Sequence, residues 1–426
     1  MKNRNKRWSK DFIIKKLNVV TDDGARSLQS LVGQSLAIRY EESAGNTLTV
    51  SFVFADAIGF RASAPLRSGQ EVELVVDHPS IDEPFEFTKS KNNELIISNI
   101  ISSFSDAKRE IFGFECVTQS TLSNQTTRVF KKYKGKISDS VEKILKEVLE
   151  VKSDRIDIVD ESSNTYDFMG NYMRPLDCIS RLSAKTVGDV EGKISPEKGS
   201  AGYFLAETER SGYRFFSVDK ALKREVEEKY IKAAAKSAAE VNNFSLVSSP
   251  EFITSHDIIK KLMEGQYKSA NWYYNILDRT PHFVEYSYKD SKLPSANEDQ
   301  YVPNKIDEKF SRIYTTALDV GAMSDTPDLK TIAETVSWRQ AHASARYQSL
   351  MSEFVKVTIP LNLSIQVGSM LNFKFPNLNT EKNKEGVNPS SGNYMVFSLA
   401  HEMGGPQGAF TGLYIVRDSF AFYSNE

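Results

Sequence analysis

A pattern of β-strands near the start of the chain recurs near its end, and this repeat limits the fold more than any other feature. The early copy covers residues 65–76 and 110–117, and the late copy covers residues 361–375 and 392–399. In each copy a glycine (Gly69 or Gly368) comes shortly before residues that alternate between polar and apolar, as in a strand with one buried face. Glycine supplies the positive φ that a tight turn needs. Two similar small β-barrels in one chain favour a role in assembly over catalysis.

Length and charge exclude several classes of protein. The chain has 426 residues, which corresponds to two to four domains, and 25 Phe and 18 Tyr supply a packed core. A net charge of −2 argues against whole-protein affinity for nucleic acid or an anionic membrane. Apolar runs are too short to span a bilayer, so we expect no stable membrane insertion. The basic segment 1–10 lacks the apolar core of a secretory signal.

The pattern of apolar residues divides the chain into three regions. Residues 1–125 carry six or seven strand signals and are predicted to form a first β-barrel. Residues 126–265 mix helical and strand periods and are predicted to form an α/β domain. Residues 266–426 are predicted to form a second β-barrel with a long polar loop and a helical insertion. The fold class is therefore β-rich α+β, with two similar barrels and an intervening α/β region.

Within these regions the expected elements are specific. Helices are predicted from residue 137 to 149, over 175–184 with Pro175 in the first turn, over about 222–241 where Ala, Lys and Glu dominate, and over 328–351. A hairpin is predicted at 203–218, and aromatic strands at 272–276 and 282–288. The polar stretch 289–308 is too long for a plain connector, which indicates a functional loop or a partner-contacting arm.

Motifs of catalysis and metal binding are not found. His401 begins His-Glu-Met-Gly-Gly, which lacks the second histidine of a zinc protease helix, so we expect His401 to be a surface residue at a strand end. Gly33-Gln-Ser-Leu-Ala37 fails as a nucleophile elbow, and no phosphate-binding or dinucleotide loop is present. Cys116 and Cys178 have neither zinc nor disulfide spacing. We therefore predict no enzyme, no catalytic or metal residue and no cofactor.

Two features could contact partners. Trp8 lies in the basic N-terminal segment, where an exposed tryptophan could anchor a contact, although a solvated tail is the simpler interpretation. The aromatic run 272–274 could stack on a sugar or a base, but barrel core or a subunit interface is the favoured interpretation.

Short matches along most of the chain resemble a known family, the central baseplate hub proteins of contractile-tailed phages, which are related to the hub part of type VI secretion spike proteins. The matching segments are 36–43, 56–57, 65–71, 114–119, 127–133, 174–182, 202–207, 215–219, 366–371 and 391–402. None is specific alone, and the signal lies in their order and spacing. The stretch between 219 and 350 is long for the family, and 289–308 matches no familiar pattern.

The resemblance implies a homotrimeric ring with two barrels (tube domains) per subunit. Such a pseudo-sixfold ring adapts a threefold cell-puncturing spike to a sixfold tail tube, and closes through heterologous interfaces. The implied partners are a trimeric tail spike protein, a tail tube or tube-initiator protein and baseplate wedge proteins. DNA passes through the lumen without specific binding, which fits the near-neutral charge. The implied location is the virion tail baseplate, assembled in the host bacterial cytoplasm.

Alternatives remain open. The same mechanics fit the hub of a tailocin or a secretion spike. A cell-wall glycan-active enzyme needs two carboxylates across a cleft, and pairs such as Glu207 with Glu209 occur in any highly charged chain. The chain ends at Glu426 soon after the second barrel, so we expect the spike to be a separate protein.

Overall fold

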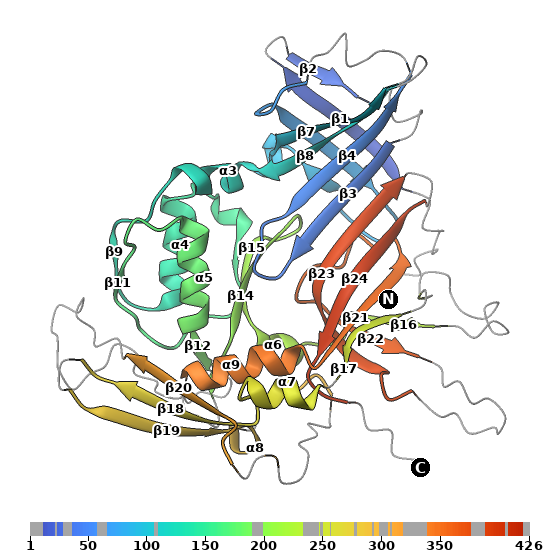
Figure 1. Ribbon diagram of the computed structural model, residues 1–426. Helices are drawn as coiled ribbons and strands as arrows, with labels where there is room; N and C mark the ends of the chain where they lie inside the picture. Colours follow the sequence, from blue (N-terminus) through green and yellow to red (C-terminus); the bar gives the residue numbers. More distant parts are fainter. Residues whose placement is uncertain are drawn as a thin grey trace, which may run out of the picture.

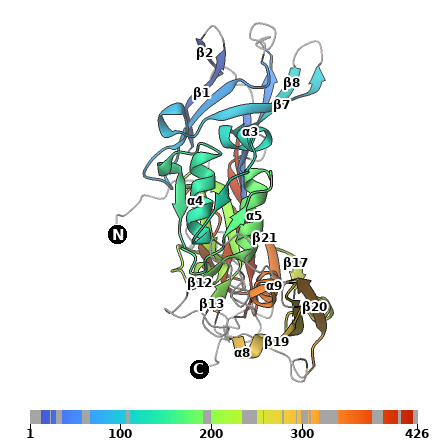
Figure 2. The same cartoon turned by 90° about the vertical axis from the view of Figure 1, so that its left-hand side faces the viewer.

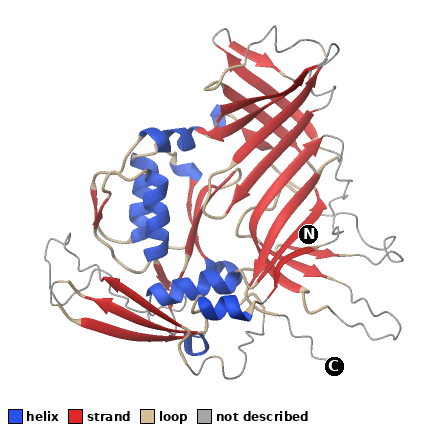
Figure 3. Cartoon of the chain, in the orientation of Figure 1, coloured by secondary structure: helices blue, strands red, loops and turns tan. Residues whose placement is uncertain are grey.

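A single large β-sheet dominates the molecule (Figures 1 and 3). The computed structural model describes residues 12–21, 24–28, 36–57, 66–105, 110–189, 199–232, 247, 250–255, 257–276, 279–291, 294–297, 306, 309–317, 339–375, 388–404 and 408–420. Fourteen strands form the sheet, in the order β17-β21-β24-β23-β3-β4-β8-β7-β5-β1-β2, with β22 beside β23, β16 beside β22, and β6 beside β5. The helices gather on one side of it (Figure 3).

Two sets of strands contribute to this sheet. The N-terminal set is β1 (Ile13–Thr21), β2 (Gly24–Ser27), β3 (Leu36–Ser43), β4 (Thr49–Asp56), β5 (Glu71–Asp77), β6 (Phe85–Phe87), β7 (Leu95–Ser105) and β8 (Glu110–Thr118). The C-terminal set is β16 (Glu228–Ile231), β17 (Glu251–Ser255), β21 (Glu353–Pro360), β22 (Met370–Lys374), β23 (Gly392–Gly404) and β24 (Phe410–Arg417). β3, β4, β5 and β21 alternate between more and less buried residues along their length, as the sequence predicts.

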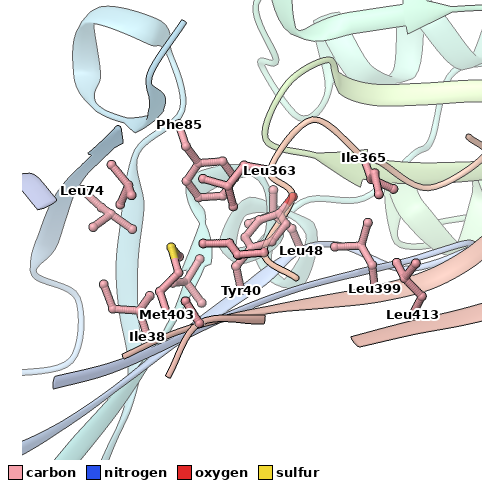
Figure 4. Packing of buried hydrophobic residues seen from close by; sticks show 14 of the residues in the cluster. Ile38, Tyr40, Leu48, Leu74, Phe85, Leu363, Ile365, Leu399, Met403 and Leu413 are labelled. Carbon is pink, nitrogen blue, oxygen red and sulfur yellow. The ribbon is translucent and has the colours of Figure 1, made fainter. Parts of the chain in front are cut away.

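Both sets face one hydrophobic core (Figure 4). Ile38 and Tyr40 of β3 and Leu74 of β5 belong to the same buried cluster as Leu399 and Met403 of β23. Neither set closes on itself among the described residues. The chain thus shows two strand sets in one sheet, and the prediction of two closed barrels is not confirmed.

The two sets share one topology over five strands. The first runs β3-β4-β8-β7-β5 and the second runs β17-β21-β24-β23-β22, and in both the strands follow the chain in the order first, second, fifth, fourth, third. The pairing also agrees residue by residue. Corresponding positions are Tyr40 with Phe252, Val50 with Val355, Cys116 with Ile415, Ile97 with Val396 and Glu71 with Met370. The internal repeat is therefore a property of the fold.

The glycine turns that first indicated the repeat are equivalent. Gly69 has φ +92° and Gly368 has φ +84°. The Gly69 N–H donates to the Ile97 carbonyl at 2.8 Å, and the Gly368 N–H donates to the Val396 carbonyl at 2.9 Å. A β-bulge follows both acceptors, on β7 and β23 respectively. The positive φ predicted for both glycines is confirmed.

The second strand of the early copy was matched to the wrong strand of the late copy. The sequence pattern matched 110–117 to 392–399, but the counterpart of β23 is β7, and the counterpart of β8 is β24. Alternation of polar and apolar residues identifies a strand but not its partner, so two neighbouring strands with similar patterns could be exchanged.

The middle of the chain packs helices against a small sheet beside the large one (Figures 1 and 2). The helices are α3 (Gln119–Thr126), α4 (Ile137–Glu147), α5 (Pro175–Lys185) and α6 (Val218–Leu222), with a short 3₁₀ turn at Ser153–Arg155; another such turn, Lys89–Lys91, lies between β6 and β7. The strands are β9 (Lys132–Tyr133), β10 (Ile156–Ile158), β11 (Phe168–Met169), β12 (Val187–Asp189), β13 (Gly199–Ala201), β14 (Tyr203–Thr208) and β15 (Gly212–Ser217). The predicted helices at 137 and 175 and the predicted hairpin are confirmed.

The helix predicted over 222–241 is wrong where the structure describes it. After α6, residues Glu228–Ile231 form β16, which pairs in parallel with β22. Tyr230 stacks on Phe373, and its hydroxyl accepts a hydrogen bond from Asn362 Nδ2 at 2.9 Å. Helix propensity is a weak preference that such tertiary pairing overrides. Residues 233–241 lie outside the described ranges.

A separate three-stranded sheet follows, with β18 (Lys268–Tyr274) between β19 (Pro281–Ser287) and β20 (Arg312–Ala317). It is accompanied by α7 (Ile258–Met263), α8 (Tyr288–Ser291) and α9 (Arg339–Leu350). Arg346 of α9 is fully buried and pairs with Asp219 at 2.5 Å and Asp418 at 2.7 Å. These ion pairs fix α9 to α6 and to the end of β24. The domain boundaries at 125/126 and 265/266 stay a prediction.

Candidate functional site

The strongest candidate for a functional region is the seam where the two strand sets meet. The second half of β23 pairs with β3, from Ser398 opposite Ser43 to Gly404 opposite Ala37. Tyr40 and His401 lie opposite each other there, with ring centroids 5.5 Å apart. The seam therefore joins both repeats into one continuous β-sheet.

A hairpin tip from the middle of the chain enters this seam. The Glu209 N–H donates to the Tyr40 hydroxyl at 2.9 Å, and that hydroxyl donates to Glu42 at 2.7 Å. The Glu86 N–H donates to the Glu209 carboxylate at 2.9 Å, and Arg210 donates to the Ser364 carbonyl at 3.3 Å. The β14–β15 hairpin thus holds both strand sets and ties them to the helical region.

Three carboxyl groups surround the hairpin, of which Glu42 and Glu207 are buried and Glu209 is half-buried. Burial raises the pKa of Glu42 to about 8 and the pKa values of Glu207 and Glu209 to about 7. Hydrogen bonds partly offset the rise in pKa that burial causes. Glu42 accepts a hydrogen bond from the Val367 N–H at 2.9 Å, and Glu207 accepts one from the Leu48 N–H at 3.3 Å. Because these oxygens accept bonds from backbone N–H groups, the arrangement fits a packed joint rather than a pair of carboxylates across a cleft.

Sequence reasoning missed this cluster, although a signal was present. Leu36, Ile38, Tyr40 and Glu42 share one face of β3 at period two, so the strand pattern places an acid among core residues. The contact between β3 and the β14–β15 hairpin, which lies 160 or more residues further along the chain, has no local sign in the sequence.

Several strand edges in the large sheet have no partner among the described residues, and two of them belong to the counterparts of β23 and β3. The second half of β7, from Asn99 to Ser105, pairs with β8 on one side only, and β17 pairs with β21 on one side only. Both carry exposed apolar side chains, namely Ile101 (45% exposed), Phe252 (42%) and Ile253 (47%). Apolar edge strands of this kind are templates for pairing with another chain.

The histidine and cysteine predictions have mixed outcomes. His401 lies within β23 and is buried, so its prediction as a surface residue is wrong; burial lowers its pKa to about 3. Its Nδ1 lies 2.9 Å from the Thr411 hydroxyl. Within the described ranges no group of three His, Cys, Asp or Glu side chains could hold a metal ion. Cys116 and Cys178 are buried and free.

The aromatic run 272–274 lies in β18, outside the large sheet. Trp272 (42% exposed) and Tyr274 (44%) share one face with Phe283 and Ile313, while Tyr273 is buried on the other face. A place in a barrel core is therefore wrong for Trp272 and Tyr274, and a role at an interface stays a prediction.

Other predicted contact regions are only partly described. In the polar stretch, the Ala296 N–H donates to Asp418 at 3.0 Å and the Asn297 N–H to the Ser419 hydroxyl at 2.9 Å. That part of the stretch packs on the chain itself, and a role in partner contact stays a prediction. The basic segment 1–10 lies outside the described residues. In the parts of the chain that can be assessed, no helix has the length and hydrophobicity to cross a membrane.

Comparison with solved structures identifies the fold. The chain is similar to the tail protein from Neisseria meningitidis MC58, with 9% identity, a TM-score of 0.57 and coverage of 95% of this chain and 96% of that one. It is also similar to the 43 kDa tail protein of prophage MuSo2 from Shewanella oneidensis, with 8% identity, a TM-score of 0.53 and coverage of 95% and 99%. A third similar structure is prophage tail protein gp18 from Listeria monocytogenes EGD-e, with 8% identity, a TM-score of 0.50 and coverage of 94% of each chain.

Comparisons by sequence give no match. The chain matches no protein-family model and no curated protein. At these identities the likeness establishes the fold, which is that of phage tail proteins, and the predicted resemblance to tail and baseplate proteins is confirmed at that level.

Proposed function

We propose that the protein is the structural baseplate hub of a contractile phage tail, with no catalytic role. The fold shared with three phage tail proteins over nearly their full lengths supports a structural role in a tail. The observation that carries the finer proposal is the residue-by-residue repeat with its unpaired edges. In this role three copies form a ring of six repeats, which adapts a threefold spike to a sixfold tube.

The seam within the chain supplies the register for the seam between chains. β23 pairs with β3 inside the chain; β7 is the counterpart of β23, and β17 is the counterpart of β3. Both counterparts lack that pairing among the described residues. Transferring the register places Ile100 of one subunit opposite Ser255 of the partner subunit, and Ile101 opposite Thr254 of the partner subunit. The contact is heterologous, so a ring closes when the rotation per repeat is one sixth of a turn.

Cross-linking tests this proposal. Directly opposed residues in antiparallel strands have Cα atoms about 4.5–5.5 Å apart, within the range that a disulfide spans. We expect the double variant Ile101→Cys with Thr254→Cys to form oxidised trimers. The matched control, Ile101→Cys with Glu251→Cys, is out of register and should stay monomeric on a denaturing gel. Cross-linking of the control but not of the test pair would contradict the register.

Native mass provides the second readout. We expect a species of three times 48.0 kDa, about 144 kDa, for the purified protein or for its mixture with the spike protein of the same tail. A protein that stays at 48.0 kDa with the spike present contradicts the hub function.

The remaining roles follow from the ring. One face binds the trimeric spike, the other binds the tail tube or its initiator protein, and the α/β region faces the baseplate wedges. DNA passes through the lumen without specific binding, which a net charge of −2 supports. The protein acts in the virion tail after assembly in the bacterial cytoplasm.

A further inference from the structure

A large cavity lies between the helical region and the large sheet. Its volume is about 690 Å³, within the range of cavities that hold small ligands or a few side chains. Side chains from α5, β14, β21 and β23, together with the residue directly after α9, form apolar walls: Leu176, Phe204, Leu205, Met351, Phe354 and Phe397. Thr254 of β17, which the proposed ring places at the subunit contact, also lines this cavity.

A buried lysine lines one end of the cavity. Lys261 of α7 is 8% exposed, and its ammonium group makes no hydrogen bond or ion pair with the described residues. The usual burial of apolar and charged residues is reversed in α7, because Ile259 (71% exposed) and Met263 (69%) are exposed while Lys261 is buried. Burial lowers the pKa of Lys261 to about 8, and the negative charges of Asp418 and Asp257 oppose this shift.

Two further polar atoms in the cavity wall lack partners. The Ser352 hydroxyl belongs to a residue that is 3% exposed, and it makes no hydrogen bond within the described structure; neither does the Gln348 Oε1 atom. The wall thus offers a cation, a hydroxyl and a carbonyl acceptor beside an apolar space. Buried groups of this kind are normally paired, so a ligand that binds here would carry groups complementary to them.

We propose that this cavity binds a peptide segment of a partner protein in which an apolar side chain adjoins a carboxylate. The carboxylate pairs with Lys261 and accepts from Ser352, a peptide N–H donates to Gln348, and the apolar side chain packs against Phe204 and Phe397. A peptide supplies all three groups at once. The carboxylate is either the C-terminus of the partner or an Asp or Glu side chain. The proposal does not depend on the ring.

Fluorescence anisotropy with three labelled peptides tests the site on the full chain. The probes are Gly-Ser-Gly-Leu-Phe with a free C-terminal carboxylate, the same peptide as its amide, and Gly-Ser-Gly-Phe-Glu amide. We expect one carboxylate form to bind at least about tenfold more tightly than the uncharged amide, as one charge-assisted hydrogen bond gives. The preferred acid identifies the source. No saturable binding below about 1 mM overturns the proposal.

Variants connect binding to the cavity. Lys261→Met should remove the preference for the carboxylate, while Lys223→Met, an exposed lysine outside the cavity, should leave it intact. Ser180→Trp places a ring at an exposed position of the cavity rim and should weaken all three peptides with unchanged melting temperature. Retention of the carboxylate preference in Lys261→Met overturns the proposal; that variant removes a buried charge and should fold at least as well as the parent.

Discussion

At the scale of single residues, Glu42 makes the seam sensitive to pH. It is buried, and its folded pKa of about 8 lies above its ordinary value of 4.5. Between these values the folded state holds a proton that the unfolded state has released, so stability falls as pH rises through this window. Below pH 4.5 this contribution is fully present, and above pH 8 it is lost.

Replacing this acid with its neutral isostere separates the two effects. We expect Glu42→Gln to match the parent near pH 4.5 and to exceed its free energy of unfolding by several kcal/mol at pH 8, at about 1.4 kcal/mol per pKa unit. Urea unfolding at both pH values measures this difference. The control Glu41→Gln, on the other face of β3, should change stability by less than about 1 kcal/mol at either pH. An equal effect of Glu42→Gln at both pH values would refute this linkage.

At the scale of elements, the glycine turns offer a matched comparison. Gly69 and Gly368 both have positive φ, so alanine at either costs about 1 kcal/mol or more in backbone strain. A Cβ at Gly69 meets open space, whereas at Gly368 it lies 3.2 Å from the Phe216 ring. We expect Gly368→Ala to destabilise more than Gly69→Ala by about 1–2 kcal/mol, as overpacking does. Thermal unfolding measures this, and equal losses would show that the Phe216 ring moves freely.

The elements also show what the sequence could predict. Period-two alternation and the two glycines were enough to predict most strands and the turns before β5 and β22. Strand partners distant in the sequence were not predictable, because β23 pairs with β3 across more than 350 residues and no local pattern encodes that contact. The helix prediction at residues 228–231 was wrong for the same reason, since this Ala-, Lys- and Glu-rich stretch forms a strand through its pairing with β22.

At the scale of the whole molecule, the open edges should control assembly. Ile101 is exposed on the unpaired half of β7, and in the proposed ring it lies at the contact between subunits. We expect Ile101→Asp to shift the native mass from about 144 kDa to 48.0 kDa without unfolding the chain. Light scattering and circular dichroism measure the two properties. Phe130→Asp, which alters a more exposed apolar residue in the helical region, should leave the mass unchanged.

β23 has a consequence for how such a ring forms. Its first half pairs with β22 and its second half with β3, so each chain completes one junction between repeats as it folds. In a ring of three chains, three of the six junctions would then form at a rate independent of protein concentration. The other three depend on encounters between chains. Six junctions of one geometry thus fall into two kinetic classes, and dilution opens only the second.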